Sequence, residues 1–157
     1  MLKITRNIVD EMIRHGRAAA PLEACGYLAE KDGVVCKCIA MKNIDASPVH
    51  YSMDPAQQFA AIRSCRAEGL TIRAVYHSHP ETGAYPSAED IKLAFDPAVS
   101  YVIVSLAEST PCINSFTIRD HAVFSEKIEI IGSTANTPVS YTHLRAHETL
   151  RSISYAV

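Results

Sequence analysis

The sequence lacks several features that would place it in a specialised class of protein. It has no long run of Lys and Arg, its formal net charge is −2 and its isoelectric point is about 6.4. No basic surface for nucleic acid or an anionic membrane is therefore expected. No segment approaches the roughly 18 consecutive apolar residues of a membrane span. Charges interrupt the apolar positions of residues 1–16, unlike those of a signal peptide. We therefore expect a cytoplasmic protein that binds neither nucleic acid nor membrane.

Cysteine is present, but its spacing does not predict a site. The chain has five cysteines, an odd number, and no export signal, which favours reduced thiols over a disulfide framework. Cys36 and Cys38 form a C-x-C pair, but no second Cys or His pair stands at the spacing of a zinc finger. We expect buried or edge-strand thiols at Cys25, Cys36, Cys38, Cys65 and Cys112.

Length and composition predict one globular domain. The chain has 157 residues, of which 48% are hydrophobic and 20% charged. A chain of this size buries roughly two thirds of its unfolded surface, so it needs no disulfide or structural metal to form a core. A bound metal would therefore be available for chemistry. Neither an internal repeat nor a low-complexity linker is visible, and we place the domain at residues 1–131.

The remaining segment, residues 132–157, differs in composition. It is rich in Ser, Thr and Ala, shows no clean period, and its YTHLRAHET stretch resembles translated cloning sequence. We expect a disordered or vector-derived tail. His143 and His147 stand four residues apart, where a helix would offer both imidazoles to a metal, but such a tail is not expected to form that helix.

The hydrophobic pattern predicts an α/β fold with a mixed sheet. A first helix should run from a Thr5 cap to about Ala18, and a second should start at Pro55 after an Asp54 cap, with Phe59, Ile62 and Cys65 on one face. Lys31-Asp32-Gly33 predicts a hairpin turn. The expected strands are 23–30, 34–41, 71–77, 101–106, 113–118 and 123–131, and a third helix is expected at 88–95.

One run of residues has the spacing of a metal site. His77, His79, Ser87 and Asp90 form the pattern H-x-H-x7-S-x2-D. Residues two apart on a strand point the same way, so both imidazoles would lie on one side of the sheet. Two imidazoles and one carboxylate are a common ligand set for a catalytic zinc, with one position left open for water.

A structural interpretation of the same residues is also available. Ser87 and Asp90, taken alone, look like a helix start with Ser87 as N-cap, and the two histidines alone could be ordinary strand residues. All four at this spacing, however, would occur in a shuffled chain of this composition roughly once in a thousand times. The joint pattern therefore favours a functional site.

Glu23 is the candidate general base. A hydrolase that uses metal-bound water needs a group that takes a proton and passes it to the leaving amine, a role worth about 10²–10⁴ in rate. Glu23 opens the mostly apolar segment PLEACGYL, where an acidic residue is otherwise unexplained, although a surface glutamate would also suit the composition.

With these residues in place, the chain resembles the JAMM metallopeptidases, the catalytic branch of the MPN domains. The segments PLEACGYL, HSHP, PSAED and SYVIVS carry the resemblance, which covers about residues 2–131 and is strongest to small stand-alone bacterial and archaeal members. It implies a curved mixed sheet flanked by helices, similar to that of zinc deaminases such as cytidine deaminase. It also implies one zinc ion on His77, His79 and Asp90, with Glu23 as general base and Ser87 steadying the tetrahedral intermediate.

The resemblance further implies a substrate class. Family members hydrolyse peptide or isopeptide bonds that follow the C-terminal Gly-Gly of ubiquitin or ubiquitin-like proteins. Only short connections link Asp90 to Tyr101, so insertions for ubiquitin-chain specificity are absent, and we expect a ubiquitin-like sulfur carrier as partner. An extended tail would pair with an exposed strand edge beside the zinc. Cys25 either lines this pocket or is a buried structural thiol, and the second is favoured.

Three alternatives share parts of this pattern. A non-catalytic MPN-type binding module would have the same fold, but such modules typically lose motif residues, and all five are present here. A zinc nucleobase deaminase would need a P-C-x-x-C ligand pair, which the sequence lacks. RadC-like proteins usually have H-N-H-P-S-G where this chain has HSHPET.

Overall fold

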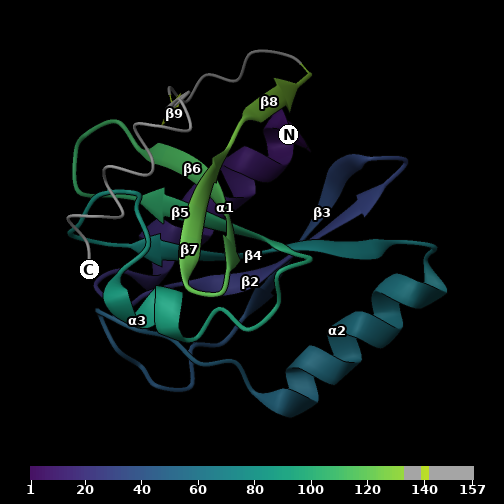
Figure 1. Ribbon diagram of the computed structural model, residues 1–157, viewed down its shortest axis with the longest axis horizontal. Helices are drawn as coiled ribbons and strands as arrows, with labels where there is room; N and C mark the ends of the chain where they lie inside the picture. The colour runs from purple at the N-terminus through teal and green to yellow at the C-terminus, as the bar shows by residue number, and fades with distance from the viewer. Residues whose placement is uncertain (133–138, 142–157) are drawn as a thin grey trace.

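The computed structural model describes residues 1–132 and 139–141, and within these ranges it contains three helices and nine strands in one sheet (Figure 1). The helices are α1 (Arg6–Ala19), α2 (Pro55–Ala67) and α3 (Ala88–Lys92). The strands are β1 (Leu2–Thr5), β2 (Cys25–Lys31), β3 (Val34–Met41), β4 (Thr71–His79), β5 (Ser100–Ser105), β6 (Cys112–Arg119), β7 (Ala122–Glu126), β8 (Ile128–Ile131) and β9 (Ser140–Tyr141).

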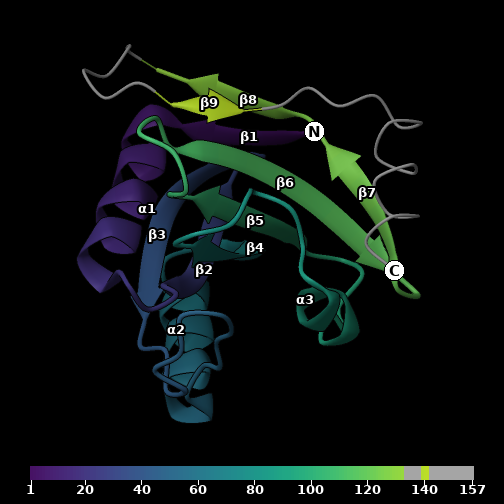
Figure 2. The same ribbon diagram turned by 90° about the vertical axis from the view of Figure 1, so that its left-hand side faces the viewer.

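The sheet is mixed and strongly curved (Figure 2). Its strand order is β7-β6-β5-β4-β2-β3-β1-β8, and β9 adds to β6 outside this path. Parallel pairs join β4 to β5 and β1 to both β3 and β8, whereas the hairpin neighbours are antiparallel. The predicted α/β fold with a mixed, curved sheet and flanking helices is confirmed.

Helix α1 covers one face of the sheet. Thr5 stands at its N-cap, as predicted, although the Thr5 hydroxyl makes no capping hydrogen bond. The buried stripe Ile8, Val9, Met12 and Ile13 packs on alternate residues of the strands, including Ala74 and Tyr76 of β4. Because side chains alternate along a strand, the intervening residues of β4 point to the opposite face.

The opposite face carries two smaller clusters. Cys25, Tyr27 and Met41 pack with Ala61 of α2, while Ile103, Phe116, Ile118 and Val123 pack with Ile91 of α3. Cys25, His77 and Ile103 are direct neighbours across β2, β4 and β5. His77 therefore lies between the α2 cluster and the α3 cluster.

Several predicted elements differ from the structure in their extent. Strand β2 begins at Cys25, so Glu23 lies before the strand. The segment predicted as one strand from Val123 to Ile131 divides at Lys127 into β7 and β8, which lie at opposite edges of the sheet order. Helix α3 is also shorter than predicted, and β1 was not predicted.

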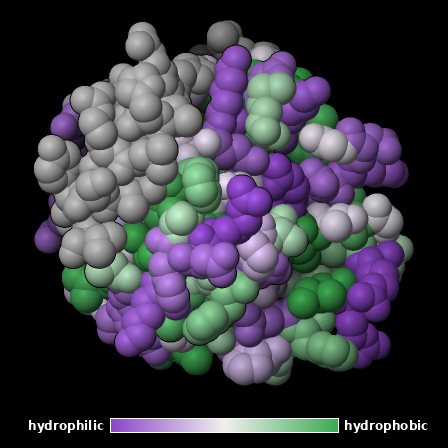
Figure 3. Space-filling view, viewed as in Figure 1, coloured by the Kyte–Doolittle hydropathy of each residue, from purple (hydrophilic) through white to green (hydrophobic). Residues whose placement is uncertain are grey.

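The predicted buried face of α2 is wrong in part. Asp54 caps the helix as expected, with its carboxylate accepting from the Ala56 N–H at 2.9 Å. The side chains that reach the sheet are Ala61 and Cys65, whereas Phe59 is 64% exposed and Ile62 39% exposed. The space-filling view accordingly shows hydrophobic surface in the region of α2 (Figure 3).

Most of the predicted tail, including His143 and His147, lies outside the described residues. In its described part, Ser140 and Tyr141 form β9 and pair with Cys112 and Ile113. The five cysteines are free thiols, with Cys25 and Cys65 buried and Cys36 exposed. Among the described helices, none combines the length and apolar character needed to cross a membrane.

Candidate metal centre

Strand β4 carries both histidines of the motif to one place. His77 and His79 are buried and point to the face opposite α1, as the two-residue spacing predicted. Ser78 between them points to the α1 side, where an added Cβ on Gly16 of α1 would touch the Ser78 Cβ at 3.4 Å. The absence of a side chain at Gly16 thus lets the helix approach the strand at this point.

Helix α3 brings in the carboxylate. Ser87 is its N-cap: the Ser87 Oγ accepts from the Asp90 N–H at 3.0 Å, and the Asp90 Oδ2 accepts from the Ser87 N–H at 2.9 Å. This reciprocal capping box fixes the direction of the Asp90 side chain. The capping interpretation and the site interpretation of these residues are therefore compatible.

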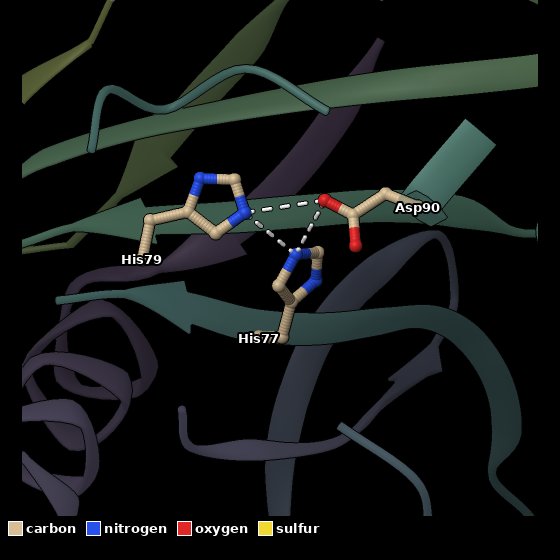
Figure 4. A group of neighbouring side chains, drawn as sticks. All are labelled: His77, His79 and Asp90. Atoms are coloured by element: carbon tan, nitrogen blue, oxygen red, sulfur yellow. Dashed lines mark hydrogen bonds and ion pairs between the residues drawn. The ribbon is translucent and has the colours of Figure 1, made fainter. Parts of the chain in front are cut away.

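Three ligand-type atoms converge between β4 and α3 (Figure 4). The His77 Nε2 lies 3.0 Å from the His79 Nε2 and 3.0 Å from the Asp90 Oδ2, and the His79 Nε2 lies 3.2 Å from the same oxygen. Two ligands at about 2.0–2.1 Å from a tetrahedral zinc are roughly 3.3 Å apart. The triangle is close to that size, so the three residues could hold a metal ion.

The hydrogen bonding of His79 supports a cation at this point. The His79 Nδ1 lies 2.8 Å from the carbonyl oxygen of Gly83, which can only accept, so the Nδ1 carries a proton. In the neutral imidazole the lone pair is then on Nε2 and faces the Asp90 carboxylate. A lone pair and a carboxylate oxygen in contact require a proton or a metal ion between them, and the backbone contact orients the ring as in known metal sites.

Burial and charge act in opposite directions on the three groups. Burial lowers the pKa of His77, and Asp90 opposes this effect only in part. Burial by itself would also lower the pKa of His79 and raise that of Asp90. The contacts with Asp90 and Gly83 nevertheless raise the pKa of His79, and the contacts with both histidines hold the pKa of Asp90 well below its usual range. The carboxylate is therefore kept ionised, as a metal ligand must be.

Glu23 is buried close to this group. Glu23 is only 3% exposed, and its Oε1 has no hydrogen-bond partner among the described residues. Burial raises the pKa of Glu23 to about 8, with His79 opposing and Asp90 adding to the effect. An acidic group so placed can exchange a proton near neutral pH.

Three contacts of the site were not predicted from the sequence. The Tyr51 ring stacks on His77, with ring centroids 4.7 Å apart and planes at 29°. Asn43 donates to the carbonyl oxygen of Glu23 at 3.1 Å, and the Ser78 Oγ accepts from the Ala24 N–H at 2.8 Å. The sequence motifs do not predict these contacts, because each contact joins segments that meet only in the folded chain.

A cavity of about 350 Å³ opens beside the converging atoms. His77 and Asp90 line it together with aromatic side chains that include Tyr27, Tyr51 and Tyr101. Cys25 is fully buried in the α2 cluster and is not among the lining residues, in agreement with the favoured structural interpretation of this thiol. The cavity has the size of a small-molecule site.

Strand β4 does not itself offer a free edge at His77, so the expected strand edge beside the site is not formed there. Through His77 the strand pairs with β2 on one side and β5 on the other, and the Ser78 N–H donates to the Ala24 carbonyl. The backbone of β4 at His77 is thus already paired on both sides, whereas His79 pairs with Ser105 of β5. An extended peptide therefore cannot pair with β4 at His77.

Comparison with known proteins identifies the family. Residues 5–119 match the model of the prokaryotic homologs of the JAB domain. The chain belongs to the prokaryotic JAB-domain family. The matched range of this JAB domain contains Glu23, both histidines, Ser87 and Asp90.

The relatives of this JAB-domain protein include one named as a peptidase and one named as a desampylase. A CysO-cysteine peptidase of Mycobacterium tuberculosis is 35% identical over 134 residues, which are 83% of this chain and 92% of the relative. A desampylase of Haloferax volcanii is 32% identical over 111 residues, 66% of this chain and 80% of the relative. The expectation of a JAMM-type peptidase is confirmed.

A solved structure has the same fold as the described part of this chain. A protein from Desulfitobacterium hafniense, determined in solution, is 43% identical and superposes with a TM-score of 0.79, covering 85% of this chain and 94% of its own. The described part of the JAB domain therefore has the architecture of a solved relative.

Proposed function

We propose that this JAB-domain protein is a zinc peptidase that cleaves the peptide or isopeptide bond following the C-terminal Gly-Gly of a ubiquitin-like sulfur-carrier protein. The convergence of the His77 Nε2, the His79 Nε2 and the Asp90 Oδ2 within 3.0–3.2 Å carries this proposal. Three protein ligands leave one position of a tetrahedral ion open, as in catalytic zinc sites. When bound, zinc lowers the pKa of its water from 15.7 toward about 7 and polarises the scissile carbonyl.

Glu23 takes the role of proton carrier in this proposal. Its Oε1 is buried and without a partner among the described residues, which leaves it available to a water molecule or a leaving group. The carboxylate accepts a proton as water attacks the carbonyl carbon and returns it to the departing amine nitrogen. Because Glu23 is separate from the three converging atoms, it need not bind the ion to act.

Ser87 takes the role of hydrogen-bond donor. The Ser87 Oγ accepts from the Asp90 N–H, and its own O–H proton stays free for another acceptor. Placed beside the proposed ligand Asp90, this hydroxyl can donate to the oxygen on which negative charge develops. Loss of one such donor typically costs about 10²–10³ in kcat.

The substrate class rests on the relatives and on the size of the site. One relative is named for the cysteine conjugate of CysO and another for desampylation. The cavity of about 350 Å³ beside His77 is large enough to hold a single residue of the leaving group. Helix α3 ends at Lys92 and β5 begins at Ser100. The connection between them is therefore too short to contain a large insertion beside the cavity.

The test is a processing assay on carriers of defined sequence. The zinc-loaded protein is incubated with a sulfur-carrier protein extended by one cysteine past Gly-Gly, and the carrier mass is followed by mass spectrometry. We expect loss of the added residue and no further trimming. A carrier whose mass stays unchanged, with zinc bound at one ion per chain, would refute the proposed substrate class.

A matched set of carriers separates the parts of the proposal. A carrier ending in Gly-Ala before the added cysteine tests the requirement for Gly-Gly, because it places a side chain at the residue before the scissile bond. A carrier joined through Gly-Gly to a lysine side chain tests isopeptide cleavage. Cleavage of the first would contradict the Gly-Gly requirement.

A further inference from the structure

A single side chain organises the loop between β3 and α2. The Asn43 side chain makes five hydrogen bonds, all of them with backbone groups that lie two to twenty residues away in the sequence. The partners belong to the Asn43 loop, defined as residues 43–53, and to the segment before β2. No sequence motif singled out Asn43, and the proposed function assigns it no role.

The two ends of the Asn43 amide have separate tasks. The Nδ2 donates to the carbonyl oxygens of Glu23 at 3.1 Å and His50 at 3.0 Å, with Ser47 at 3.4 Å. The Oδ1 accepts from the N–H groups of Asp45 at 3.1 Å and Ser52 at 3.2 Å. The partners determine which atom is which, since carbonyls only accept and N–H groups only donate.

The first task concerns Glu23, which lies outside the sheet. Its N–H donates to the Ser47 carbonyl at 2.9 Å, and its carbonyl accepts from the Asn43 Nδ2. The next residue, Ala24, is bonded through both its N–H and its carbonyl to Ser78. The main chain of Glu23 is thus fixed between the Asn43 loop and the strand that carries both histidines.

The second task concerns Tyr51. The His50 carbonyl and the Ser52 N–H, which flank Tyr51, are both bonded to the Asn43 amide. The Tyr51 ring stacks on the His77 imidazole. One side chain therefore holds the residue proposed to carry the proton and the ring that packs on a proposed ligand.

We propose that Asn43 is a positioning residue of the peptidase, which sets the Glu23 carboxylate relative to the His77 imidazole by tying the backbone of Glu23 to the segment that carries Tyr51, whose ring stacks on His77. The inference rests on the proposed function, because it assumes that Glu23 carries the proton. Asn43 acts through Glu23 and touches neither the ion nor the substrate. A misplacement of about 1 Å in a reacting group can cost on the order of 10²-fold in rate.

Asn43→Asp separates the two tasks. The variant keeps an oxygen for the Asp45 and Ser52 N–H groups, but it replaces the donor that faces Glu23 with a second acceptor. We expect kcat on the cysteine-extended carrier to fall about 10- to 100-fold. We expect KM to change less than about threefold and the zinc content to remain one ion per chain, because the three ligands are elsewhere.

Ser47→Ala is the matched control. The Ser47 Oγ accepts from the Val49 and His50 N–H groups of the same loop, whereas Ser47 contacts Glu23 only through its backbone carbonyl, which the variant keeps. A role of Asn43 in loop stability alone would give both variants similar losses of activity. Nearly wild-type kcat in Ser47→Ala with a low kcat in Asn43→Asp supports the inference, and equal values in the two variants overturn it.

A double-mutant cycle tests whether Asn43 acts through Glu23. In the Glu23→Asp background, whose shortened carboxylate is already displaced, Asn43→Asp should cost much less than in wild type. Full additivity would overturn the inference. If Asn43→Asp does not fold, Asn43→Ser takes its place in the same cycle with the same expected outcome. Undiminished activity of Glu23→Gln would instead refute the proposed base, a result distinct from failure of the Asn43 test.

Discussion

Glu23 combines a buried carboxylate with a main chain that is bonded on both sides. Replacing Glu23 with Gln keeps the size of the side chain but removes its ability to take up a proton. We expect hydrolysis of the cysteine-extended carrier to fall by about 10²–10⁴. Zinc should remain bound, because the three converging atoms belong to other residues. Turnover by mass spectrometry and metal content by elemental analysis check the two parts, and an active Glu23→Gln enzyme would contradict the proposed base.

Asp90→Asn tests the metal site itself. The amide oxygen can still accept from the Ser87 N–H, so the start of α3 should persist, but the negative charge that the ion needs is gone. We expect zinc affinity to fall by at least about 100-fold, measured by competition with a chromogenic chelator. The control is Glu89→Gln, which neutralises the adjacent exposed carboxylate of α3. Similar affinities in the two variants would show that Asp90 is not a ligand.

The sequence contained the chemistry of the site but not its framework. His77 and His79 could be placed together because two-residue spacing on a strand fixes their direction, and Asp90 follows from the capping box at Ser87. Asn43 and Tyr51 could not be placed. Their contacts depend on how an irregular loop folds back on β4, and no local periodicity encodes such a path.

At the scale of elements, α2 shows how far a periodic pattern can be trusted. The capping residue and the proline at the first position were both predictable, because they are local. The buried face of α2 was not predictable, because two faces of the helix could each pack on the sheet. The sheet below already presents Tyr27 and Met41, so the small side chains of Ala61 and Cys65 let the helix approach, and the larger Phe59 remains outside.

This arrangement predicts unequal costs for two substitutions in α2. Phe59→Ser should change the free energy of unfolding by no more than about 0.5 kcal/mol, because the ring is mostly exposed. Cys65→Ser places a hydroxyl where a thiol is 1% exposed and should cost about 1–3 kcal/mol. Urea denaturation of the two variants measures the difference. A larger loss for Phe59→Ser would mean that Phe59, and not Cys65, packs against the sheet.

Strand β2 contains a glycine that the sheet requires. A Cβ on Gly26 would overlap the carbonyl oxygen of Ile39 and the ring of Tyr76. Gly26→Ala should therefore destabilise the protein by about 1–3 kcal/mol or more, measured by urea denaturation. Gly83→Ala is the control, because a Cβ there meets no atom within 4 Å. Equal stability of the two variants would contradict the close packing of Tyr76 on β2.

At the scale of the whole molecule, sequence patterns could not predict the order of the strands in the curved sheet. Strand β7 lies at one end of the strand order and β8 at the other, although only Lys127 separates them in the chain. The apolar alternation continues across both strands, so it predicts one strand. The partner of β8 is β1, a four-residue strand whose pairing with β3 and β8 brings the start of the chain next to residues 128–131.

Glu126 links several strands and predicts how the stability of the molecule depends on pH. Its carboxylate accepts hydrogen bonds from Ser100 of β5, Ser115 of β6 and Arg73 of β4. Burial by itself would raise the pKa of Glu126, but these hydrogen bonds and the charge of Arg73 outweigh it and lower the pKa below its ordinary value of 4.5. The native state then binds fewer protons than the unfolded state in this range. The stabilisation is therefore complete above pH 4.5 and is lost as the pH falls through the lowered native value.

We expect Glu126→Gln to be less stable than wild type at neutral pH, and the difference should shrink at successive pH values below 4.5, as measured by urea denaturation. Glu129→Gln, at an exposed glutamate of β8, is the control and should follow wild type. A difference between Glu126→Gln and wild type that stays constant with pH would show that the ionisation of Glu126 does not contribute to stability.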